Sequence, residues 1–407
     1  MVRIHPRMQA LNFLAVLLLI PAAQCARAAT VDTNPLNREP EVQDAFQHFY
    51  NMDYDAAMVR FEKIHSDHPG NPIATDYLLD AVLFRELTRL DLLDTTFYAN
   101  DGFLTGKHTV TEDPKLRDRV KALTEEAVSE ASAELKTNPN DVNALFARGW
   151  ARSLEATYLG MVQRAFGAGL KQALGARSDC DRVLQLDPHY ADAELVSGVY
   201  QYVVGALPFG FKLLVGFVGI HGSKAEGMAM LRDDGAHGVI TSLEARTALM
   251  LFLRREAKYG EAVAIARGLR EEYPHNYLFR LEEANLEKDG GEGMKAVDTY
   301  ERLIEQAKQP GYYYSAHLEL AYFGLGDSLR GQKRFAEAVD VYREGANQAK
   351  TSAELRRRCL LAAGQCHDLM GQHGKAVQDY EQVLSAGSDT VQGELARKYM
   401  RSGYSGN

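Results

Sequence analysis

Apolar residues recur at helical spacing along most of the chain. Residues 258–274 (KYGEAVAIARGLREEYP) and 333–345 (KRFAEAVDVYREG) place apolar side chains every three or four positions, with charged side chains between them. In an α-helix this spacing gathers the apolar side chains on one face. Residues 186–195 (LDPHYADAEL) are typical of a turn followed by a helix. Because no segment alternates as a strand would, the pattern predicts an all-α protein.

Small and aromatic residues repeat at fixed intervals within this helical pattern. Gly326, Ala338 and Tyr342 are separated by 12 and 4 residues, and Gly364, Ala376 and Tyr380 repeat both intervals. A small residue lets a neighbouring helix approach closely, and the aromatic residue one turn later fills the groove. The predicted packing positions are Gly149, Ala176, Gly198, Gly227, Ala262, Ala284, Ala296, Tyr300, Gly326, Ala338, Tyr342, Gly364, Ala376 and Tyr380.

Prolines complete the repeat. Four further triplets step by 4 and then 8 residues and end on a proline, which stops the second helix of each pair: Ala57-Phe61-Pro69, Ala127-Ala131-Pro139, Ala176-Cys180-Pro188 and Ala262-Ala266-Pro274. These positions resemble the tetratricopeptide repeat (TPR), a helix-turn-helix unit of about 34 residues. The resemblance implies a right-handed TPR-like α-solenoid, for which we expect about seven helical pairs.

Three repeats in the middle of the chain are longer than the others. The step from the first helix to the second is 27 residues from Gly149 to Ala176 and 29 from Gly198 to Gly227, instead of 12. From Leu79 to Ala127 it is 48 residues. Insertions at equivalent points of a solenoid emerge along one edge. We therefore expect long connections near residues 91–114, 156–172 and 205–222, packed on one another.

The third of these insertions is apolar and rich in glycine. From Val203 to Ile220 its only charged residue is Lys212. A central lysine disfavours a membrane-spanning helix. An element buried against neighbouring helices and a hairpin lying on a membrane both remain open. The candidate ligand- or partner-binding residues in and beside this insertion are Pro208, Phe209, Phe211, Lys212, Phe217, His221 and Lys224.

A second resemblance covers roughly residues 140–275. Leu207-Pro208, the apolar run, the Gly216-Phe217-x-Gly219 turn and the Gly222, Lys224, Gly227 and Leu231 positions resemble the eukaryotic inclusion-body clearance family of TPR proteins. The block also resembles a group of exported bacterial repeat proteins. The turn at residues 220–224 lacks the acidic residue that would be usual there. The resemblance implies a binding or adaptor role and proximity to a membrane.

The first 28 residues are typical of a secretory signal. Arg3 and Arg7 precede an apolar run at residues 10–20, and Ala26-Arg27-Ala28 offers small residues for cleavage. Lipidation at Cys25 is the alternative. We expect export to the periplasm or cell envelope. Cleavage removes three arginines and no acidic residue, so the net charge falls from −9 to −12. Such an acidic chain is expected to bind no nucleic acid.

No residue pattern indicates catalysis, a cofactor or a metal site. His65 and His68, and Cys366 with His367 and His373, lack the spacing of recognised zinc sites. The odd number of cysteines after residue 28, Cys180, Cys359 and Cys366, predicts free, buried thiols. The basic run at residues 354–361 (ELRRRCLL) is typical of a solvated helix face, with an acidic partner as the alternative.

The sequence divides into a signal peptide (1–28), N-terminal repeats (29–140), extended repeats (141–240), C-terminal repeats (241–390) and a capping helix with a tail (391–407). Stacked helical pairs form a long groove, so we expect a non-enzymatic exported scaffold that binds a protein or peptide in its concave groove. The alternative is an envelope- or lipid-associated protein that uses residues 203–220 for membrane or acyl-chain contact. Peripheral membrane contact and the oligomeric state stay open.

Overall fold

The computed structural model describes residues 32–98, 110–207, 221–314 and 316–406, and every regular element in these ranges is a helix. The first eight α-helices are α1 (Pro40–Tyr50), α2 (Tyr54–Asp67), α3 (Pro72–Arg89), α5 (Pro114–Thr137), α6 (Val142–Met161), α7 (Phe166–Leu186), α8 (Glu194–Ala206) and α10 (Lys224–His237). They are followed by α11 (Ser242–Arg255), α12 (Tyr259–Glu272), α13 (Tyr277–Asp289), α14 (Gly293–Ala307), α15 (Leu318–Gly331), α16 (Phe335–Asn347), α17 (Ala353–Leu369), α18 (His373–Ser385) and α19 (Val391–Ser402). Three short 3-10 helices are η1 (Pro35–Arg38), η2 (Thr95–Tyr98) and η3 (Ala191–Ala193).

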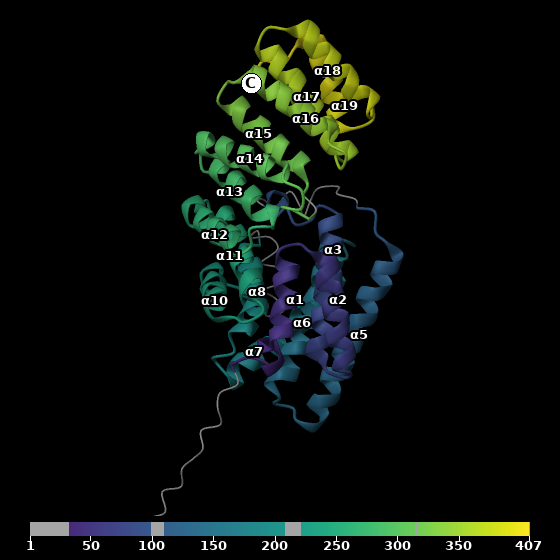
Figure 1. The fold of residues 1–407 in the computed structure, drawn as a ribbon, viewed down its shortest axis with the longest axis vertical. Coiled ribbons are helices and arrows are strands. Elements are labelled where there is room, and N and C mark those ends of the chain that lie inside the picture. Colours follow the sequence, from purple (N-terminus) through teal and green to yellow (C-terminus); the bar gives the residue numbers. More distant parts are fainter. Residues whose placement is uncertain (1–31, 99–109, 208–220, 315, 407) are drawn as a thin grey trace, which may run out of the picture. The chain divides into compact units, whose positions relative to one another are not determined.

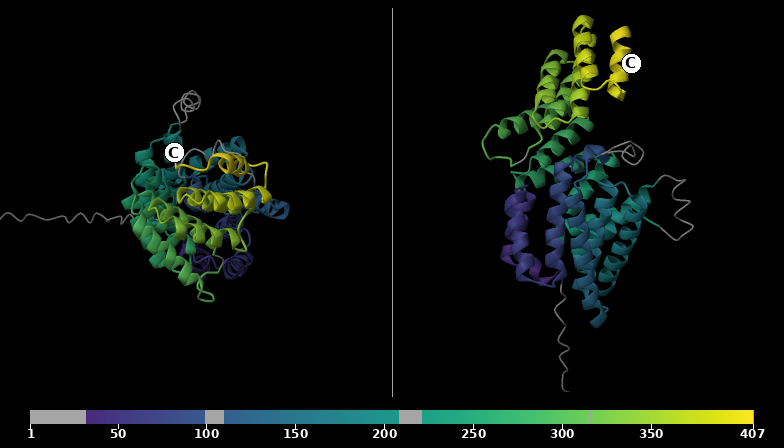
Figure 2. Two further views of the ribbon diagram at one scale, coloured as in Figure 1. Left: turned by 90° about the horizontal axis from the view of Figure 1, so that it is seen from above. Right: turned by 90° about the vertical axis from the view of Figure 1, so that its right-hand side faces the viewer.

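Most of these helices pack against the helix that follows in the chain, as Figure 1 shows for α10–α19. Figure 2 shows the same succession from two further directions. The described residues hold eight helical pairs, α1/α2 to α17/α18, one more than the spacing predicts. Helix α19 closes the series, with Tyr399 5.9 Å from the Tyr380 ring centre to centre. The predicted all-α solenoid is confirmed.

Local sequence sets where the helices begin. Pro72 and Pro114 open α3 and α5, where a missing N–H costs no helical hydrogen bond. The Asp141 carboxylate caps α6 by accepting hydrogen bonds from the backbone N–H groups of Asn143 and Ala144, both at 3.1 Å. These signals give each pair a defined register, and the register decides which side chains meet between helices.

The glycines of the repeat lie where two helices come closest. A Cβ atom at Gly326 would lie 2.5 Å from the Tyr342 ring, and one at Gly364 would lie 2.5 Å from the Tyr380 ring. In the third pair a Cβ at Gly149 would lie 2.8 Å from Cys180 Sγ. Only a residue without a side chain therefore fits these positions unless the neighbour moves.

The long connections differ from the expectation in one repeat. Helix α6 runs to Met161 and α7 begins at Phe166, so most of the extra residues of the third repeat lengthen both helices. The prediction of a long connection at residues 156–172 is wrong, because the apolar residues there continue the helical pattern. The other two insertions join α3 to α5 and α8 to α10, and their central residues 99–109 and 208–220 lie outside the described residues.

Two smaller expectations have clear outcomes. In the sequence, three tyrosines at 312–314 follow the Pro310-Gly311 turn, which predicts that they enter the next helix, but α15 begins only at Leu318. The three cysteines Cys180, Cys359 and Cys366 are free and buried, as predicted. Burial raises the pKa of the Cys359 thiol to about 12 and that of Cys366 to about 11. These thiols are therefore unreactive packing groups at neutral pH.

The N-terminal pairs also contact helices far along the chain. The Tyr50 hydroxyl donates to the Ile240 carbonyl at 2.6 Å, and Asn276 Nδ2 donates to the Tyr50 carbonyl at 2.8 Å. Met52 lies in one apolar cluster with Tyr277. The chain thus packs its first two pairs against the fifth and sixth pairs, in addition to stacking neighbours in order.

Candidate partner-binding site

The burial of α13, the first helix of the sixth pair, limits where a partner could bind in the groove expected from the repeats. Along α13 almost every side chain is buried, and Glu282 is only 2% exposed. The Thr95 N–H donates to Glu282 Oε1 at 2.9 Å, and the Thr95 hydroxyl donates to Oε2 at 2.6 Å. Residues between α3 and α5 therefore cover this face of α13.

Arg254 of α11 completes the same polar cluster. Its guanidinium donates to the Thr95 hydroxyl at 2.9 Å and to Asp289 Oδ2 at 2.9 and 2.5 Å. Burial raises the pKa of Glu282 to about 7, with the negative charge of Asp94 acting in the same direction. Because the chain's own residues satisfy these groups, the faces of α11 and α13 at this point offer little to an outside ligand.

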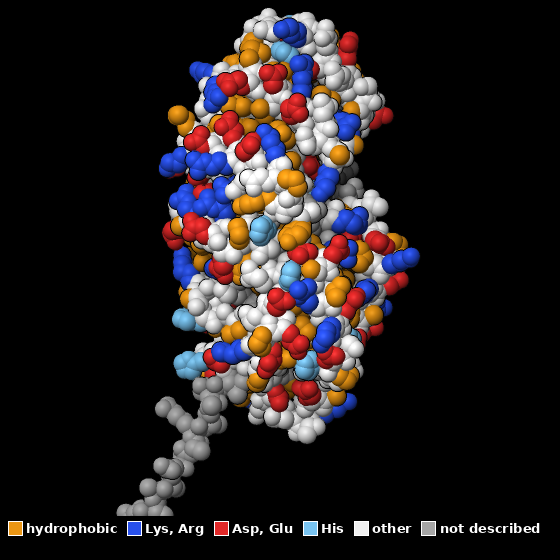
Figure 3. Space-filling view, viewed as in Figure 1, with side chains coloured by type: hydrophobic (Ala, Val, Ile, Leu, Met, Phe, Trp, Pro, Cys, Tyr) orange, Lys and Arg blue, Asp and Glu red, His pale blue; other side chains and the backbone are white. Residues whose placement is uncertain are grey.

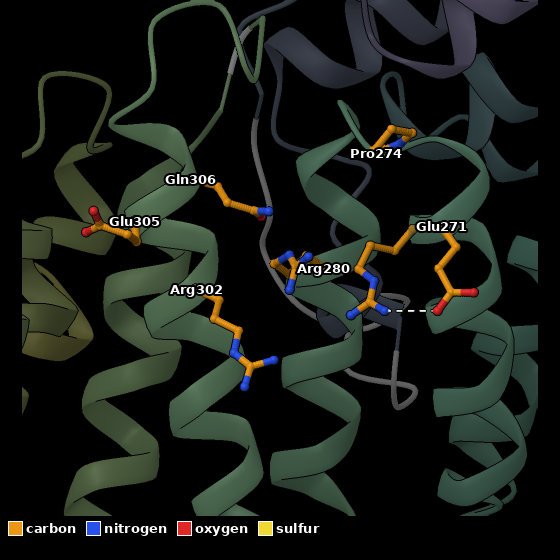
Figure 4. Close-up of a pocket in the computed structure, with 7 residues that line it drawn as sticks. Glu271, Pro274, Arg280, Arg302, Glu305 and Gln306 are labelled. Atoms are coloured by element: carbon orange, nitrogen blue, oxygen red, sulfur yellow. Dashed lines mark hydrogen bonds and ion pairs between the residues drawn. The ribbon is translucent and has the colours of Figure 1, made fainter.

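A pocket of about 520 Å³ opens elsewhere, where the ends of α12 and α14 meet the beginning of α13 (Figure 4). Such a volume lies within the ordinary range of ligand pockets. Three of its lining residues are arginines, one from each helix. The lining consists of Arg270, Glu271, Pro274, Arg280, Arg302, Glu305 and Gln306.

Helix boundaries place these arginines together. Arg270 is in the last turn of α12, which ends at Glu272 just before Pro274. Asn276 caps α13 by accepting a hydrogen bond from the Leu278 N–H at 3.0 Å, which fixes Arg280 near the start of that helix. Arg302 and Gln306 are four residues apart on α14 and therefore share one face. Figure 4 shows Arg280 and Arg302 on neighbouring helices of the pocket, and Arg270 also lines it.

The positive charge in this pocket is only partly neutralised. Arg270 donates to Glu283 Oε2 at 2.7 Å and to Glu271 Oε1 at 3.2 Å. Arg280 Nε is buried and has no hydrogen-bond partner among the described residues. Arg302 is exposed and forms neither a hydrogen bond nor an ion pair within the described ranges. Arg302 thus has free donors, whereas the Arg280 guanidinium is hydrogen-bonded to Tyr313 and has no carboxylate partner among the described residues. Guanidinium donors match carboxylate and phosphate oxygens.

Glu305, the acidic residue that α14 contributes to the pocket lining, does not change this. Glu305 pairs with Lys308 at 2.6 Å, and Figure 4 shows its carboxylate pointing away from Arg280 and Arg302. In Figure 3, Lys and Arg side chains gather over the level of α12–α14. An anionic group entering the pocket would therefore find a locally basic surface on a chain whose net charge is −9.

Three consecutive tyrosines lie beside the pocket. The Tyr313 hydroxyl donates to Gln306 Oε1 at 2.9 Å, and Gln306 Nε2 donates to the Tyr312 hydroxyl at 3.1 Å. The Tyr312 carbonyl accepts a hydrogen bond from His275 Nδ1 at 2.8 Å. Gly311, with φ of 75°, allows the turn before them. Tyr314 is 54% exposed, and its ring centre lies 6.3 Å from that of His275, next to the pocket residue Pro274 in sequence.

Of the seven binding residues predicted from the sequence, the structure describes His221 and Lys224, and neither lines the arginine pocket. Pro208, Phe209, Phe211, Lys212 and Phe217 lie outside the described residues, as do residues 1–28. His221 is exposed, and Lys224 Nζ pairs with Glu256 Oε1 at 2.7 Å at the end of α11. No described helix is both long enough and apolar enough to cross a membrane.

The arginine pocket was not predicted. The basic run at 354–361 was considered instead, but two of its arginines have intramolecular partners. Arg357 donates to the Ala386 carbonyl at 3.1 Å, and the Arg358 guanidinium lies 4.4 Å from the centre of the Phe323 ring. Arg270, Arg280 and Arg302 are ten or more residues apart in sequence. Their proximity depends on the angle between three helices, which composition and periodicity do not determine.

Comparisons with known proteins concern the fold alone. No protein-family model and no curated protein matches the chain. Among solved structures it is similar to a chain of the APC/C hetero-tetramer Cut9–Hcn1, with 12% identity, a TM-score of 0.48 and coverage of 92% of this chain. This chain spans 58% of that one. It is also similar to yeast Tom70, with 11% identity, a TM-score of 0.39 and coverage of 89% and 88% of the two chains.

A third solved structure is a tetratricopeptide repeat protein from Parabacteroides merdae, with 12% identity and a TM-score of 0.33. The likeness covers 81% of this chain and 99% of that one. The assignment of the present chain as an α-solenoid rests on its own helices and their contacts in series.

Proposed function

We propose that the protein is a non-enzymatic scaffold that binds an acidic segment of a partner protein in the arginine pocket between α12, α13 and α14. The observation that carries the proposal is the pair Arg280 and Arg302, which line one pocket and have no carboxylate partner among the described residues. A carboxylate that accepts from a guanidinium group forms charge-assisted hydrogen bonds, which are stronger than neutral ones.

A peptide segment fits this site better than a nucleic acid. The net charge of −9 repels an extended polyanion, whereas a short acidic segment meets only the local basic surface. The exposed Tyr314 offers an aromatic contact to a residue beside the acidic one. The partner-binding groove expected from the repeats is part of this proposal except near Thr95 and Glu282. There the chain's own residues cover the face of α13.

The place of action proposed for this scaffold is the periplasm or cell envelope. The pattern of Arg3, Arg7 and the apolar run at residues 10–20 supports export, with cleavage near Ala28 or lipidation at Cys25. An acidic segment exposed on an envelope protein would then be the partner. The oligomeric state of the scaffold does not enter this proposal.

Fluorescence polarisation with a fluorescein-labelled hexaglutamate peptide tests the proposal on the full chain. We expect saturable binding that weakens as salt is added, and a hexaglutamine peptide that does not bind. The double variant Arg280→Ala/Arg302→Ala should weaken binding by about tenfold or more, since it removes the two lining guanidinium groups that have no carboxylate partner among the described residues. Its helical content and melting temperature should match those of the unchanged protein.

The matched control is Arg85→Ala/Arg119→Ala, which removes the same charge from exposed arginines that each pair with one acid. This control should bind within about twofold of the unchanged protein, because its sites lie outside the pocket lining. Equal losses in both double variants would show that only net charge matters and would overturn the proposal. Binding unaffected by Arg280→Ala/Arg302→Ala would overturn it too.

A further inference from the structure

Three potential metal ligands meet near the seventh helical pair. Asp91, His317 and Glu319 each place one ligand atom within 4.8 Å of the other two. His317 Nδ1 lies 2.6 Å from Asp91 Oδ1 and 3.0 Å from Glu319 Oε1. His317 and Glu319 are buried, and Asp91 is partly buried. This cluster is distinct from the arginine pocket and from every site considered in the sequence.

The fold brings these residues together from distant parts of the chain. Asp91 follows the end of α3 in the second pair, whereas His317 and Glu319 are at the beginning of α15 in the seventh pair. The His317 ring stacks on the Tyr277 ring, with centres 6.1 Å apart and planes 19° apart. The hydrogen bond to Glu319 turns Nδ1 toward the two carboxylates.

Protein donors alone do not satisfy this cluster. A hydrogen on Nδ1 reaches Glu319 Oε1 with hydrogen-bond geometry. Asp91 Oδ1 is buried and pairs with the same nitrogen at 2.6 Å, and no other donor among the described residues reaches it. One N–H cannot serve two oxygens well, and a buried carboxylate oxygen without a donor is costly. A cation at the centre of the cluster would satisfy all three atoms together.

We propose that Asp91, His317 and Glu319 bind a divalent transition-metal ion of the zinc class. One imidazole nitrogen and two carboxylate oxygens form a donor set that Zn²⁺ accepts at about 2.0–2.2 Å, with a solvent molecule as the fourth ligand. The ion would join the segment after α3 to the beginning of α15. Its role is structural, because it would hold the N-terminal pairs against the C-terminal ones.

Titration of the metal-stripped full chain with Zn²⁺ tests the proposal, by calorimetry and by competition with a chromogenic chelator. We expect one equivalent to bind and the melting temperature to rise with Zn²⁺ concentration, since only the folded chain assembles the site. His317→Gln and Asp91→Asn should each weaken binding by about tenfold or more.

The matched control is His373→Gln. His373 Nδ1 also lies 2.6 Å from a carboxylate, that of Asp368, but it is exposed and belongs to no three-ligand group in the described residues. This variant should bind Zn²⁺ as the unchanged protein does. If His317→Gln binds Zn²⁺ equally well, or if the unchanged protein binds none, the proposal is wrong and His317 only bridges two carboxylates.

A second measurement covers the case in which His317→Gln fails to fold. Co²⁺ bound to the unchanged protein should give visible absorption bands typical of nitrogen and oxygen ligands, displaced by one equivalent of Zn²⁺. An intense thiolate charge-transfer band would instead place the ion at a cysteine and would overturn the assignment. Glu319→Gln should weaken the Co²⁺ bands, and unchanged bands would also contradict the proposal.

Discussion

The C-terminal pairs and the middle pairs solve the same packing problem in different ways. In the seventh and eighth pairs a tyrosine ring lies over the glycine of the facing helix, as Tyr342 does at Gly326 and Tyr380 at Gly364. In the fourth pair two glycines face each other, and a Cβ at Gly227 would lie 2.5 Å from the Gly198 carbonyl oxygen. One region uses a side chain as the spacer, and the other brings backbone against backbone.

The spacing between the glycine and the tyrosine in the C-terminal pairs places the ring between the two helices. The tyrosine hydroxyls are also satisfied, since Tyr342 donates to Asp327 Oδ1 at 2.6 Å and Tyr380 to Asp368 Oδ2 at 2.7 Å. A buried ring with a bonded hydroxyl gives a C-terminal pair both apolar area and a fixed rotation. The third pair has only Cys180 at the corresponding position, beside Gly149.

The largest expected effect comes from truncating the side chain that faces the glycine of the other helix, which is Tyr342 in the seventh pair and Cys180 in the third. Tyr342→Ala should lower the free energy of unfolding by about 4 kcal/mol, because it leaves a large cavity and an Asp327 carboxylate without its donor. Cys180→Ala removes one sulfur atom and should cost only about 1 kcal/mol. Urea denaturation followed by circular dichroism measures both. Similar losses for the two variants would contradict the distinction between the regions.

Buried acids differ between the regions as well. In the eighth pair Asp379 is fully buried, but it lies 2.6 Å from His367 Nδ1 and 2.7 Å from Arg343 Nη2. On α3, Asp76 and Asp80 are equally buried, and none of their carboxyl oxygens has a hydrogen-bond partner among the described residues. Burial raises the pKa of both, and for Asp80 the nearby Glu244 adds to the effect.

This contrast predicts a dependence of stability on pH. Where the folded pKa is raised, the folded chain holds its proton at a pH at which the unfolded chain has lost it. The stability contribution is therefore present below the unfolded value and is lost as pH rises. Glu244, whose pKa burial raises to about 7, acts in the same direction. We expect the free energy of unfolding to fall between about pH 4.5 and pH 7.

Asp80→Asn sharpens this prediction, because asparagine has the shape of the protonated acid and cannot ionise. The variant should be more stable than the unchanged protein, and this advantage should be larger by roughly 2 kcal/mol at pH 7.5 than at pH 5. The control Asp379→Asn should lose stability at pH 7.5, since Arg343 then lacks its carboxylate. Urea unfolding at both pH values measures these differences. A stability difference for Asp80→Asn that is the same at pH 5 and pH 7.5 would contradict the argument.

The repeat was predictable from the sequence because its spacing is local. Gly326, Ala338 and Tyr342 lie within two helices, so their meeting follows from helix geometry alone. The arginine pocket and the Asp91–His317–Glu319 cluster were not predictable in this way. The first depends on how three helices are set against one another, and the second on the N-terminal pairs returning to the seventh pair. Periodicity indicates which face of a helix is buried but not which distant segment covers it.

The smallest expected effect concerns the glycine of the third pair. Gly149→Ala should destabilise the fold by about 1–2 kcal/mol, because the added Cβ would lie 2.8 Å from Cys180 Sγ. Adding Cys180→Ala should restore most of this loss, since the new methyl group then occupies the space of the sulfur. The control Gly268→Ala, on α12 with nothing within 4 Å of its Cβ position, should stabilise the protein by about 0.5–1 kcal/mol. Thermal and urea unfolding of the four variants, including Cys180→Ala alone, measure the coupling. If the two changes at Gly149 and Cys180 are additive, the close approach does not depend on this contact, and the backbone carbonyl of Ala176, 3.2 Å from the Cβ position, sets the limit instead.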